Sequence, residues 1–486
     1  MKRSNPALPD FFPRVARAAF ANPFLPARRE ADLRIAGLDR DVPDRVERAL
    51  REVTTQVEAL ERAGLADVRR WRGEERRVLG LALLFDAFHR VAGPFDRLIA
   101  DQQRAGETSL RIDFARATFD LLEQRGFSPE AARRYFALFY QLRRAYHFIS
   151  NGLTGDSDLM EQLRARLWTN LFTHDVRWYD EFLWNRLEDF STLLTGETGT
   201  GKGAAAAALG RSAFIPFDDR RGAFAESFVR GFTSLNLSQF PPALLESELF
   251  GHRKGAFTGA VEEHEGVLAR CSPHGAIFLD EIGEVGPAVQ IKLLTVLQDR
   301  AFTPVGSHER RTFRGRVIAA TNRPLAALRG PDGLRPDFFY RLCSDVIEVP
   351  SLRQRLQARP AELGELVRLL TTRLAGPEAV GLAAQVEKQL RAEPGRDYAW
   401  PGNVRELEQA VRRVLLTGRY TPPPAPATAV DPAAALAARV RGGELTAEQL
   451  VADYCRQLHG QLGTYEAVAA RVQLDRRTVR KYIVAP

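Results

Sequence analysis

The chain contains little cysteine, methionine and lysine, and it has no long apolar segment. Its 486 residues include three cysteines, two methionines and six lysines. The cysteines are widely separated and form no C-x-x-C pair, which argues against a disulfide framework or a zinc site and is typical of a reducing compartment. Prolines and charges near the N-terminus interrupt any signal-peptide core, and no apolar run reaches the roughly 18 residues of a membrane span. We therefore expect a cytoplasmic protein without a membrane segment.

Length and composition indicate a globular protein with several domains. At roughly 150 residues per domain, the length predicts about three domains. Hydrophobic residues make up 45% and charged residues 27% of the chain, which excludes bulk disorder and fibrous repeats. The net charge of +8, from 69 basic and 61 acidic residues, favours an acidic partner such as nucleic acid. A coding bias toward arginine explains the same excess, because only six of the basic residues are lysine.

Residues 1–150 are predicted to form an all-α regulatory region of unknown type. Apolar residues recur at three- and four-residue spacing over 78–91 and 135–149, as on one face of a helix. Start and stop signals divide the region into about five helices, at Gly64, Gly93–Pro94, Gly106 and Ser128–Pro129. The charges are spread along the segment, so we interpret them as solvated helix faces rather than as a nucleic-acid patch.

The rest of the chain is predicted to contain an α/β domain and further helices. Residues 155–350 alternate short apolar runs with helices, and strands are expected at 191–195, 276–280 and 316–321, the pattern of a parallel sheet. Residues 351–418 return to a helical period, and 419–443 form a linker rich in proline and alanine. Residues 444–486 are predicted to be a small all-α domain.

The segment after the first predicted strand has the spacing of a P-loop. It consists of Gly196, Glu197, Thr198, Gly199, Thr200, Gly201, Lys202 and Gly203, and an alanine-rich helix follows. Such glycines let backbone N–H groups surround phosphates at a helix N-terminus, and we expect Lys202 to reach the β- and γ-phosphates of ATP. Gly203 replaces the usual serine or threonine, so no hydroxyl is expected there for Mg²⁺.

Acidic and polar residues follow two other strands of the predicted sheet. Asp280 and Glu281 end the strand at 276–280, and Thr321 and Asn322 end the strand at 316–321. Ligands of open α/β sheets bind at the carboxyl ends of the strands. We expect Asp280 to hold Mg²⁺, largely through water, Glu281 to activate the attacking water, and Asn322 to sense the γ-phosphate. Together with the P-loop, this pattern predicts an ATPase.

Residues 155–418 resemble the AAA+ ATPase domain of bacterial enhancer-binding proteins, the activators of sigma-54 RNA polymerase. The resemblance is most specific in ESELFGHRKGAFTGA, residues 246–260, because the hexapeptide GAFTGA is nearly diagnostic of that family. It extends to four further motifs in the family's order, which are LNLSQFPPALLESELFGH, AVQIKLLTVLQ, RPDFFYRL and WPGNVRELEQAV.

The resemblance implies roles for residues at matching positions. The loop that contacts sigma-54 corresponds to Gly255, Ala256, Phe257, Thr258, Gly259 and Ala260, although a loop phenylalanine more often packs on its own domain. Asn236 matches the residue that holds the Walker B glutamate until ATP signals are relayed. Arg335 and Arg341 match arginine fingers that reach a neighbouring subunit of a hexamer; the alternative is pairing with acids of their own subunit. Arg405 matches the sensor II arginine of the helical lid.

Three features depart from the family pattern. Gly203 stands where the family usually has glutamate. About a dozen additional residues around 218–228 separate the P-loop helix from LNLS, and the segment 173–187 before the first strand is also unusual. These departures concern regulation more than ATPase chemistry.

The C-terminal residues are predicted to form a DNA-binding domain. Helices at 446–460, 464–472 and 475–483 suit a helix-turn-helix whose last helix enters the major groove, and the segment resembles the Fis-like domain that closes this family. The residues expected to contact DNA are Arg476, Arg477, Thr478, Arg480 and Lys481.

These features predict a cytoplasmic activator that binds double-stranded DNA upstream of a promoter and hydrolyses ATP to remodel sigma-54 RNA polymerase from closed to open complexes. The first alternative is a DNA-binding AAA+ ATPase that remodels another protein. The second is a DNA-binding repressor without catalysis. The intact GAFTGA sequence disfavours the first alternative, and the intact ATPase residues disfavour the second.

Overall fold

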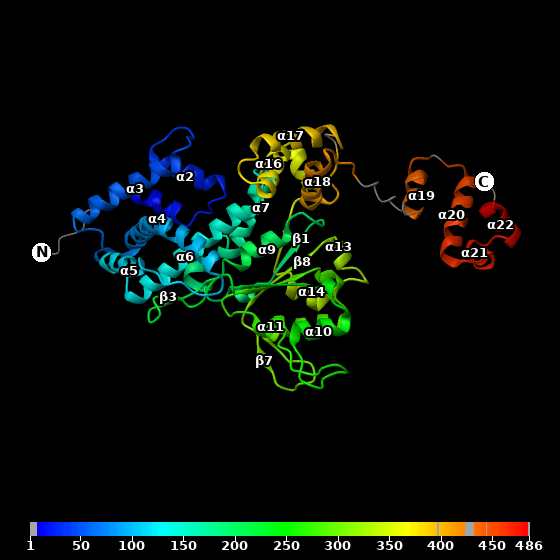
Figure 1. Cartoon of the computed structure of the whole chain (residues 1–486), viewed down its shortest axis with the longest axis horizontal. Coiled ribbons are helices and arrows are strands. Elements are labelled where there is room, and N and C mark those ends of the chain that lie inside the picture. The colour runs from blue at the N-terminus through cyan, green and yellow to red at the C-terminus, as the bar shows by residue number, and fades with distance from the viewer. Residues whose placement is uncertain (1–6, 396–397, 423–431, 444, 485–486) are drawn as a thin grey trace. The chain divides into compact units, whose positions relative to one another are not determined.

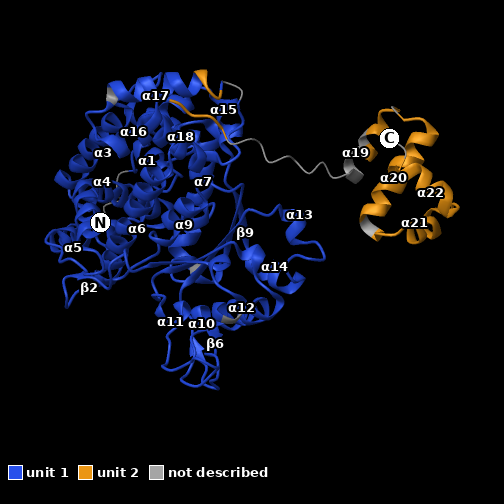
Figure 2. Ribbon diagram, turned by 45° about the vertical axis from the view of Figure 1, so that its right-hand side comes forward, with its two compact units in different colours: residues 1–391, 395–418 blue, residues 392–394, 419–486 orange. Residues whose placement is uncertain are grey.

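The computed structural model of the protein describes residues 7–395, 398–422, 432–443 and 445–484. It divides the chain into two compact units (Figure 2). The larger unit comprises residues 1–391 and 395–418, and the smaller one comprises residues 392–394 and 419–486. Of the predicted linker, residues 423–431 lie outside the described residues, whereas Pro432–Arg441 form a helix, α19.

The N-terminal region is helical, as the sequence predicted (Figure 1). Its described residues form α1 (Phe11–Ala19), α2 (Pro26–Ala36), α3 (Arg45–Arg62), the 3₁₀ turn η1 (Val68–Arg70), α4 (Gly73–Ala105), α5 (Ala115–Gln124) and α6 (Pro129–Gly152). Gly106 ends α4, and Ser128 caps α6 by accepting a hydrogen bond from the backbone N–H of Ala131 at 3.2 Å. The boundaries predicted at these two positions are confirmed.

The boundary predicted at Gly93–Pro94 is wrong, because α4 continues through it for 33 residues. A proline inside a helix removes one hydrogen bond and costs about 3 kcal/mol. Three apolar side chains just around the proline, those of Val91, Phe95 and Ile99, are buried in the core. Burial of each stabilises the helix by roughly 1.5–3 kcal/mol, so packing outweighs the local defect.

Helix α4 is also the one helix among the described residues with the length and hydropathy of a membrane span. Of its apolar 18-residue window, 56% is buried inside the protein.

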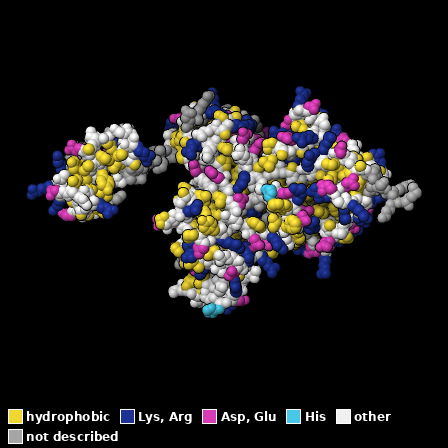
Figure 3. All heavy atoms as spheres, turned by 180° about the vertical axis from the view of Figure 1, so that it is seen from behind, with side chains coloured by type: hydrophobic (Ala, Val, Ile, Leu, Met, Phe, Trp, Pro, Cys, Tyr) yellow, Lys and Arg dark blue, Asp and Glu magenta, His cyan; other side chains and the backbone are white. Residues whose placement is uncertain are grey.

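On the face of the molecule in Figure 3, basic and acidic side chains intermingle over the larger unit. This distribution agrees with solvated helix faces.

A five-stranded parallel sheet lies at the centre of the larger unit (Figure 1). Its spatial order is β4 (Phe232–Asn236), β5 (Ala276–Asp280), β8 (Arg316–Thr321), β1 (Thr192–Thr195) and β9 (Asp345–Glu348). The three strands predicted from the sequence are confirmed. They lie next to one another in the sheet, so the segments that follow them emerge at the same edge.

Successive residues of each strand point to opposite faces of the sheet, and the two faces are covered by different helices. Leu194 belongs to a core shared with α6, α7 (Asp158–Phe172) and α9 (Lys202–Gly210). Leu193 belongs to a second core shared with α10 (Pro242–Phe250), α11 (Val267–Arg270), α12 (Pro287–Asp299) and α14 (Pro336–Leu342). The region predicted to be α/β from residue 155 begins with a helix, α7, and its first strand, β1, begins only at Thr192.

The N-terminal region is packed directly onto the helix that follows the P-loop. The guanidinium of Arg144 in α6 is fully buried and donates to the carbonyls of Arg211 and Ala213, at 2.6 and 2.7 Å. The amide of Gln141 donates to the carbonyl of Ser212 at 3.0 Å. These donors satisfy the carbonyls just beyond the C-terminus of α9. The domain boundary near residue 150 stays a prediction, and the helices on both sides of it belong to one compact unit.

Both unusual segments of the ATPase region contact the N-terminal helices. The hairpin of β2 (Phe217–Asp218) and β3 (Ala223–Phe224) places Phe224 against Tyr140, with ring centroids 4.0 Å apart. In the other segment, α8 (Val176–Trp178) and the π-helical turn η2 (Tyr179–Leu183) bury Tyr179, whose hydroxyl donates to Gln141 at 2.6 Å. The departures from the family pattern therefore form the surface that holds this N-terminal region.

The remaining described elements are short connections and the two predicted helical regions. The connections are η3 (Leu187–Asp189), η4 (Leu237–Gln239), η5 (Ile282–Glu284), β6 (Ala301–Phe302), β7 (Arg311–Thr312) and α13 (Leu325–Leu328). Residues 351–418 form α15 (Leu352–Ala358), α16 (Glu362–Ala375), α17 (Val380–Ala392) and α18 (Asn403–Thr417). The smaller unit contains, after α19, α20 (Ala447–Leu462), α21 (Tyr465–Val472) and α22 (Arg476–Val484).

Candidate nucleotide site, contact loop and recognition helix

The P-loop forms the turn between β1 and α9. Gly196, Gly199 and Gly201 have φ angles of 146°, 81° and 107°, which residues with a side chain rarely adopt. A Cβ atom at Gly199 would also collide with the carbonyl oxygen of Gly402, at the start of α18. These glycines therefore allow a tight loop that holds backbone N–H groups at the N-terminus of α9, the geometry that binds phosphate.

Lys202 lies inside this loop. Its ammonium group donates to the carbonyls of Gly196 and Glu197, at 2.7 and 3.0 Å. Burial lowers the pKa of Lys202, while the negative charges of Glu281 and Asp280 act in the opposite direction. The lysine thus lies close to the acidic pair that the sequence predicted, and it can exchange its carbonyl partners for phosphate oxygens.

The sheet register brings the predicted polar residues to one edge. Asn236 of β4 pairs with Asp280 of β5, and Thr195 of β1 pairs with Thr321 of β8. Glu281 has a φ of 58°, a strained conformation for a side-chain-bearing residue that is typical of functional sites. The amide of Asn322 donates to the hydroxyl of Thr198 in the P-loop at 3.2 Å.

Asn236 and Gly203 differ in how far their surroundings match the predicted roles. The side-chain oxygen of Asn236 accepts hydrogen bonds from the N–H and hydroxyl of Ser238, at 3.0 and 2.8 Å. These bonds hold it locally beside Asp280. A Cβ atom at Gly203 would meet no atom within 4 Å. A larger side chain would therefore fit at this position, where the usual hydroxyl is missing.

Asn403 was missed by sequence reasoning and connects α15 and α18 to the P-loop. Its side chain is fully buried and donates to the carboxylate of Glu197 and to the carbonyl of Thr198, both at 3.0 Å. Its side-chain oxygen accepts a hydrogen bond from the N–H of Leu352 in α15 at 2.7 Å. The next residue of α15, Arg353, donates to the carboxylate of Glu197 at 3.2 Å. The signal that could have found it is an asparagine directly after Gly402, at the first turn of a helix.

The three predicted arginines have different surroundings. Arg335 is exposed and pairs with Asp337 at 2.8 Å, and the Arg341 side chain is exposed with its Nε donating to the carbonyl of Leu297 at 3.1 Å. Within this single subunit, Arg335 thus has the acidic partner that the alternative interpretation expected, whereas Arg341 is bonded to a backbone carbonyl. Arg405 lies beside the P-loop, and its positive charge contributes to lowering the pKa of Lys202.

The GAFTGA residues form a turn that extends from the ATPase subdomain next to the β6–β7 hairpin (Figure 1). The N–H of Gly255 donates to the carbonyl of Ala260 at 2.8 Å and closes the turn. At its tip, Thr258 is exposed, and Phe257 is 37% exposed. The rings of Phe257 and His252 meet edge-on, with their centroids 4.8 Å apart. The ring is therefore only partly packed on its own domain.

The segment predicted to be a helix-turn-helix contains the helices α21 and α22 of the smaller unit, and its assignment as a DNA-binding motif stays a prediction. Val479 is fully buried against a core that includes Cys455, Leu458 and Val468. This packing leaves Arg477, Arg480 and Lys481 exposed on α22, with Thr478 half-buried. Arg476 is exposed too but pairs with Glu466 at 2.8 Å.

Comparison with known proteins finds similarity in the central part of the chain. Residues 183–348 match the family described as the sigma-54 interaction domain. The transcriptional regulatory protein ZraR of Escherichia coli K12 is 41% identical over 233 residues, which are 47% of this chain and 48% of ZraR. The DNA-binding transcriptional regulator NtrC of Azospirillum brasilense is 39% identical over 226 residues, 46% of this chain and 39% of NtrC.

These alignments span about half of the curated relatives or less. Among solved structures, NtrX from Brucella abortus in complex with ATP is 20% identical, with 76% of this chain and 79% of that chain covered and a TM-score of 0.40. Residues 183–348 of this chain are thus similar to the sigma-54 interaction domain, whose family model they match.

Proposed function

We propose that the protein is an ATP-dependent transcription activator that binds upstream DNA and remodels the sigma-54 RNA polymerase closed complex into an open complex. The observation that carries this proposal is the exposed GAFTGA turn on the same subdomain as a complete nucleotide site. The description of the curated relatives as transcriptional regulators supports it. Such activity places the protein in the cytoplasm.

ATP would be held by the P-loop N–H groups and Lys202, and Mg²⁺ by Asp280 together with the phosphates. The metal would neutralise phosphate charge, and the residues present suit it, because a carboxylate and phosphate oxygens are ligands that Mg²⁺ prefers. Glu281 would orient the attacking water and accept its proton. Asn322, which already bonds to the P-loop, would respond to the γ-phosphate.

The ATPase assignment is tested with Glu281→Gln and with Glu284→Gln as a matched control on an exposed residue three positions further. Glu281→Gln should bind ATP normally and lose at least about 100-fold in hydrolysis, in line with removal of a general base. Glu284→Gln should hydrolyse ATP at the normal rate. Near-normal turnover by Glu281→Gln would refute the general-base role.

The coupling assignment is tested with Thr258→Ala and Phe257→Ala. Neither residue is part of the nucleotide site, so both variants should hydrolyse ATP normally and yet produce no open complex at a sigma-54 promoter. Thr303→Ala, an exposed threonine at the neighbouring hairpin, should activate normally. Full activation by both loop variants would favour the alternative function, remodelling of a different protein.

We infer a ring, with six subunits as the expected number, from the positions of Arg335 and Arg341. Both are exposed, so each can exchange its present partner for a phosphate of a neighbouring subunit. Each arginine-to-alanine variant should keep ATP affinity but lose hydrolysis, because an arginine finger is worth roughly 10³–10⁵ in rate. Mixing such a variant with Lys202→Ala subunits should restore part of the activity, and no restoration would argue against fingers acting between subunits.

The DNA-binding assignment concerns the exposed face of α22. Affinity for an upstream site should fall steeply with salt, with a slope of about 0.9 per phosphate contact. Arg477→Ala with Arg480→Ala should weaken binding by at least about tenfold, whereas Arg456→Ala on α20 should leave it unchanged. Unchanged affinity of the double variant would place the DNA surface elsewhere.

A further inference from the structure

A large cavity among the described residues lies in the N-terminal helical region and is distinct from the nucleotide site. Its volume is about 660 Å³, and it is bounded by the α1–α2 connection, α2, α4, α6 and α7. This volume is typical of small-molecule sites, which range over roughly 300–1,000 Å³. Its lining contains no residue of the P-loop or of the acidic strand ends.

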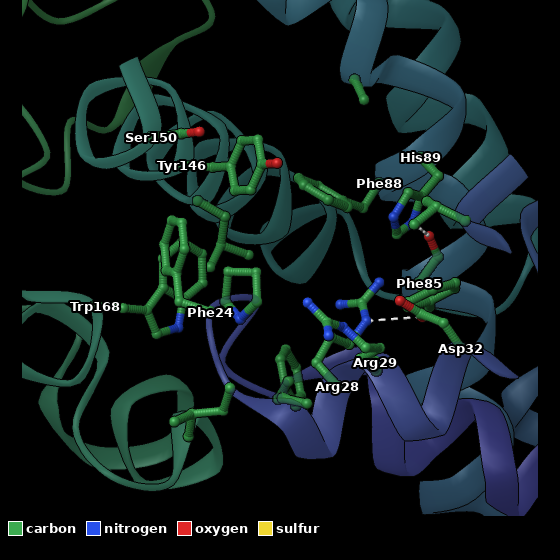
Figure 4. A pocket seen from close by; sticks show the side chains of 18 of the residues that line it. Phe24, Arg28, Arg29, Asp32, Phe85, Phe88, His89, Tyr146, Ser150 and Trp168 are labelled. Carbon is green, nitrogen blue, oxygen red and sulfur yellow. Dashed lines mark hydrogen bonds and ion pairs between the residues drawn. The ribbon is translucent and has the colours of Figure 1, made fainter. Parts of the chain in front are cut away.

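Aromatic side chains form much of the cavity wall (Figure 4). The rings of Phe24 and Tyr146 are stacked, with centroids 5.7 Å apart, and Trp168 meets Phe24 edge-on at 6.0 Å. Phe88 lies on the α4 side of the same space (Figure 4). Flat apolar walls of this kind favour a ligand with a flat ring system.

The charges around the cavity favour an anion. Its lining includes five arginines and three carboxylates. Two of these arginines, Arg45 and Arg143, pair with Asp41 and Asp96 outside the lining, so the positive charge that faces the cavity comes mainly from Arg28 and Arg29. Arg28 and Arg29 lie side by side on the cavity wall (Figure 4), where Arg28 also pairs with Asp32 at 2.9 Å and Arg29 has only a loose contact with Asp41 at 3.5 Å. His89 adds no charge at neutral pH, because burial lowers its pKa to about 4.

Three further donors at the cavity have no hydrogen-bond partner within the described part of the chain. They are the Nε atoms of Arg45 and Arg164 and the indole Nε1 of Trp168. Arg164 and Trp168 are more than nine-tenths buried. Buried polar groups are nearly always satisfied, and these three can only donate. All three atoms are inaccessible to solvent, so they offer no contact to a ligand in the cavity, and the preference for an anion rests on Arg28 and Arg29.

Helix α7 connects the cavity to the ATPase. Arg164 of α7 donates to the carbonyl of Leu153 at 2.8 Å, and Arg355 of the lid donates to the carbonyl of Thr154 at 2.7 Å. The carbonyls of the adjacent residues Leu153 and Thr154 are thus bound by Arg164, which lines the cavity, and by Arg355 of α15. Further along α7, Asn170 donates to the hydroxyl of Thr192 at 3.1 Å, in the strand that leads to the P-loop.

We propose that this cavity binds a small organic anion built on a flat aromatic ring system, and that its occupancy regulates the ATPase through α7. The binding part stands on the cavity alone. The regulatory part rests on the proposed ATPase function.

The binding part is tested on the full-length protein with 8-anilinonaphthalene-1-sulfonate as the probe. N-phenyl-1-naphthylamine, which has the same rings without the sulfonate, is the neutral comparison. The sulfonate should bind at one site per chain by fluorescence titration, at least about tenfold more tightly than the neutral compound, a difference of one charge-assisted contact. Equal or weaker binding of the sulfonate would overturn the anion assignment.

Three variants locate the probe. Ala92→Phe adds a ring to the cavity wall without removing a polar contact and should weaken sulfonate binding by at least about tenfold. Arg29→Gln should weaken it severalfold, while Arg34→Gln, an exposed arginine of the same helix outside the cavity, should have no effect. Unchanged binding to Ala92→Phe, with a normal far-UV circular dichroism spectrum, would overturn the site.

The regulatory part is tested by ATP hydrolysis at a saturating concentration of the sulfonate probe. The rate should change at least about twofold in the unmodified protein and not in Ala92→Phe. An unchanged rate in an active ATPase would refute regulation through α7 while leaving the binding site intact. If the protein hydrolysed no ATP at all, the proposed function would fail, and the titrations would still decide the binding site.

Discussion

Replacing Asn403 should weaken both the fold and its coupling to nucleotide. In Asn403→Ala, the N–H of Leu352 loses its buried partner, at a cost of about 1–3 kcal/mol, and the bonds to Glu197 and Thr198 contribute about 1 kcal/mol each. The residue has a φ of 55°, which adds about 1 kcal/mol of strain for alanine. The free energy of unfolding should therefore fall by about 4–6 kcal/mol.

Two further variants at this position separate the contributions. Asn403→Gly loses the same hydrogen bonds without the backbone strain, so it should be more stable than Asn403→Ala by about 1 kcal/mol. Asn403→Asp keeps the acceptor for Leu352 but places a carboxylate beside Glu197, so it should lose ATP affinity more than stability. Urea unfolding followed by tryptophan fluorescence gives the stabilities, and calorimetric titration gives the ATP affinity. A loss below about 1 kcal/mol in Asn403→Ala would refute this account.

Other predictions concern a glycine pair, a buried histidine and a buried arginine. Gly203→Ala should raise the free energy of unfolding by up to about 1 kcal/mol through helix propensity, since its Cβ meets no atom, whereas Gly210→Ala in the same helix should lower it, because its Cβ would collide with Phe232. The low pKa of His89, about 4 against 6.5 when unfolded, means that the unfolded chain binds the proton first. Stability should therefore fall by up to about 3 kcal/mol between pH 6.5 and 4, and urea unfolding of His89→Gln over this range should lack that contribution. Arg144→Met leaves two carbonyls after α9 without donors and should lower the unfolding free energy by about 3 kcal/mol; thermal unfolding unchanged from the parent protein would contradict this.

The arrangement of the predicted nucleotide residues needed little more than the sequence. Asp280 ends a short strand, Asn322 follows one, and Lys202 lies after the loop that follows a third. Parallel strands end at a common edge, so these residues had to lie near one another once the strands were recognised. The strands themselves are marked by continuous apolar runs. The helices of the smaller unit were equally legible, because their apolar spacing and turn residues are local.

The sequence analysis predicted a helix end at the proline of α4 that is wrong, and it missed Asn403. Both depend on packing between segments that are distant in the chain. The proline of α4 marked a helix end by local rules, yet apolar residues on both sides of it are buried against other helices, and that burial keeps the helix continuous. The local signal at Asn403, an asparagine at the first turn of a helix, did not reveal its partners, which lie about 50 and 205 residues away in the chain.

The sequence alone predicted the P-loop, the acidic strand end, the exposed GAFTGA turn and the last helix, because each is a short segment whose local structure is encoded by neighbouring residues. The tertiary structure decided how the N-terminal helices join the ATPase. The docking of Arg144 after α9, the aromatic cavity and the connection through α7 all join residues that are distant in sequence. Such contacts arise only when buried polar groups and apolar faces from separate segments satisfy one another in a common core.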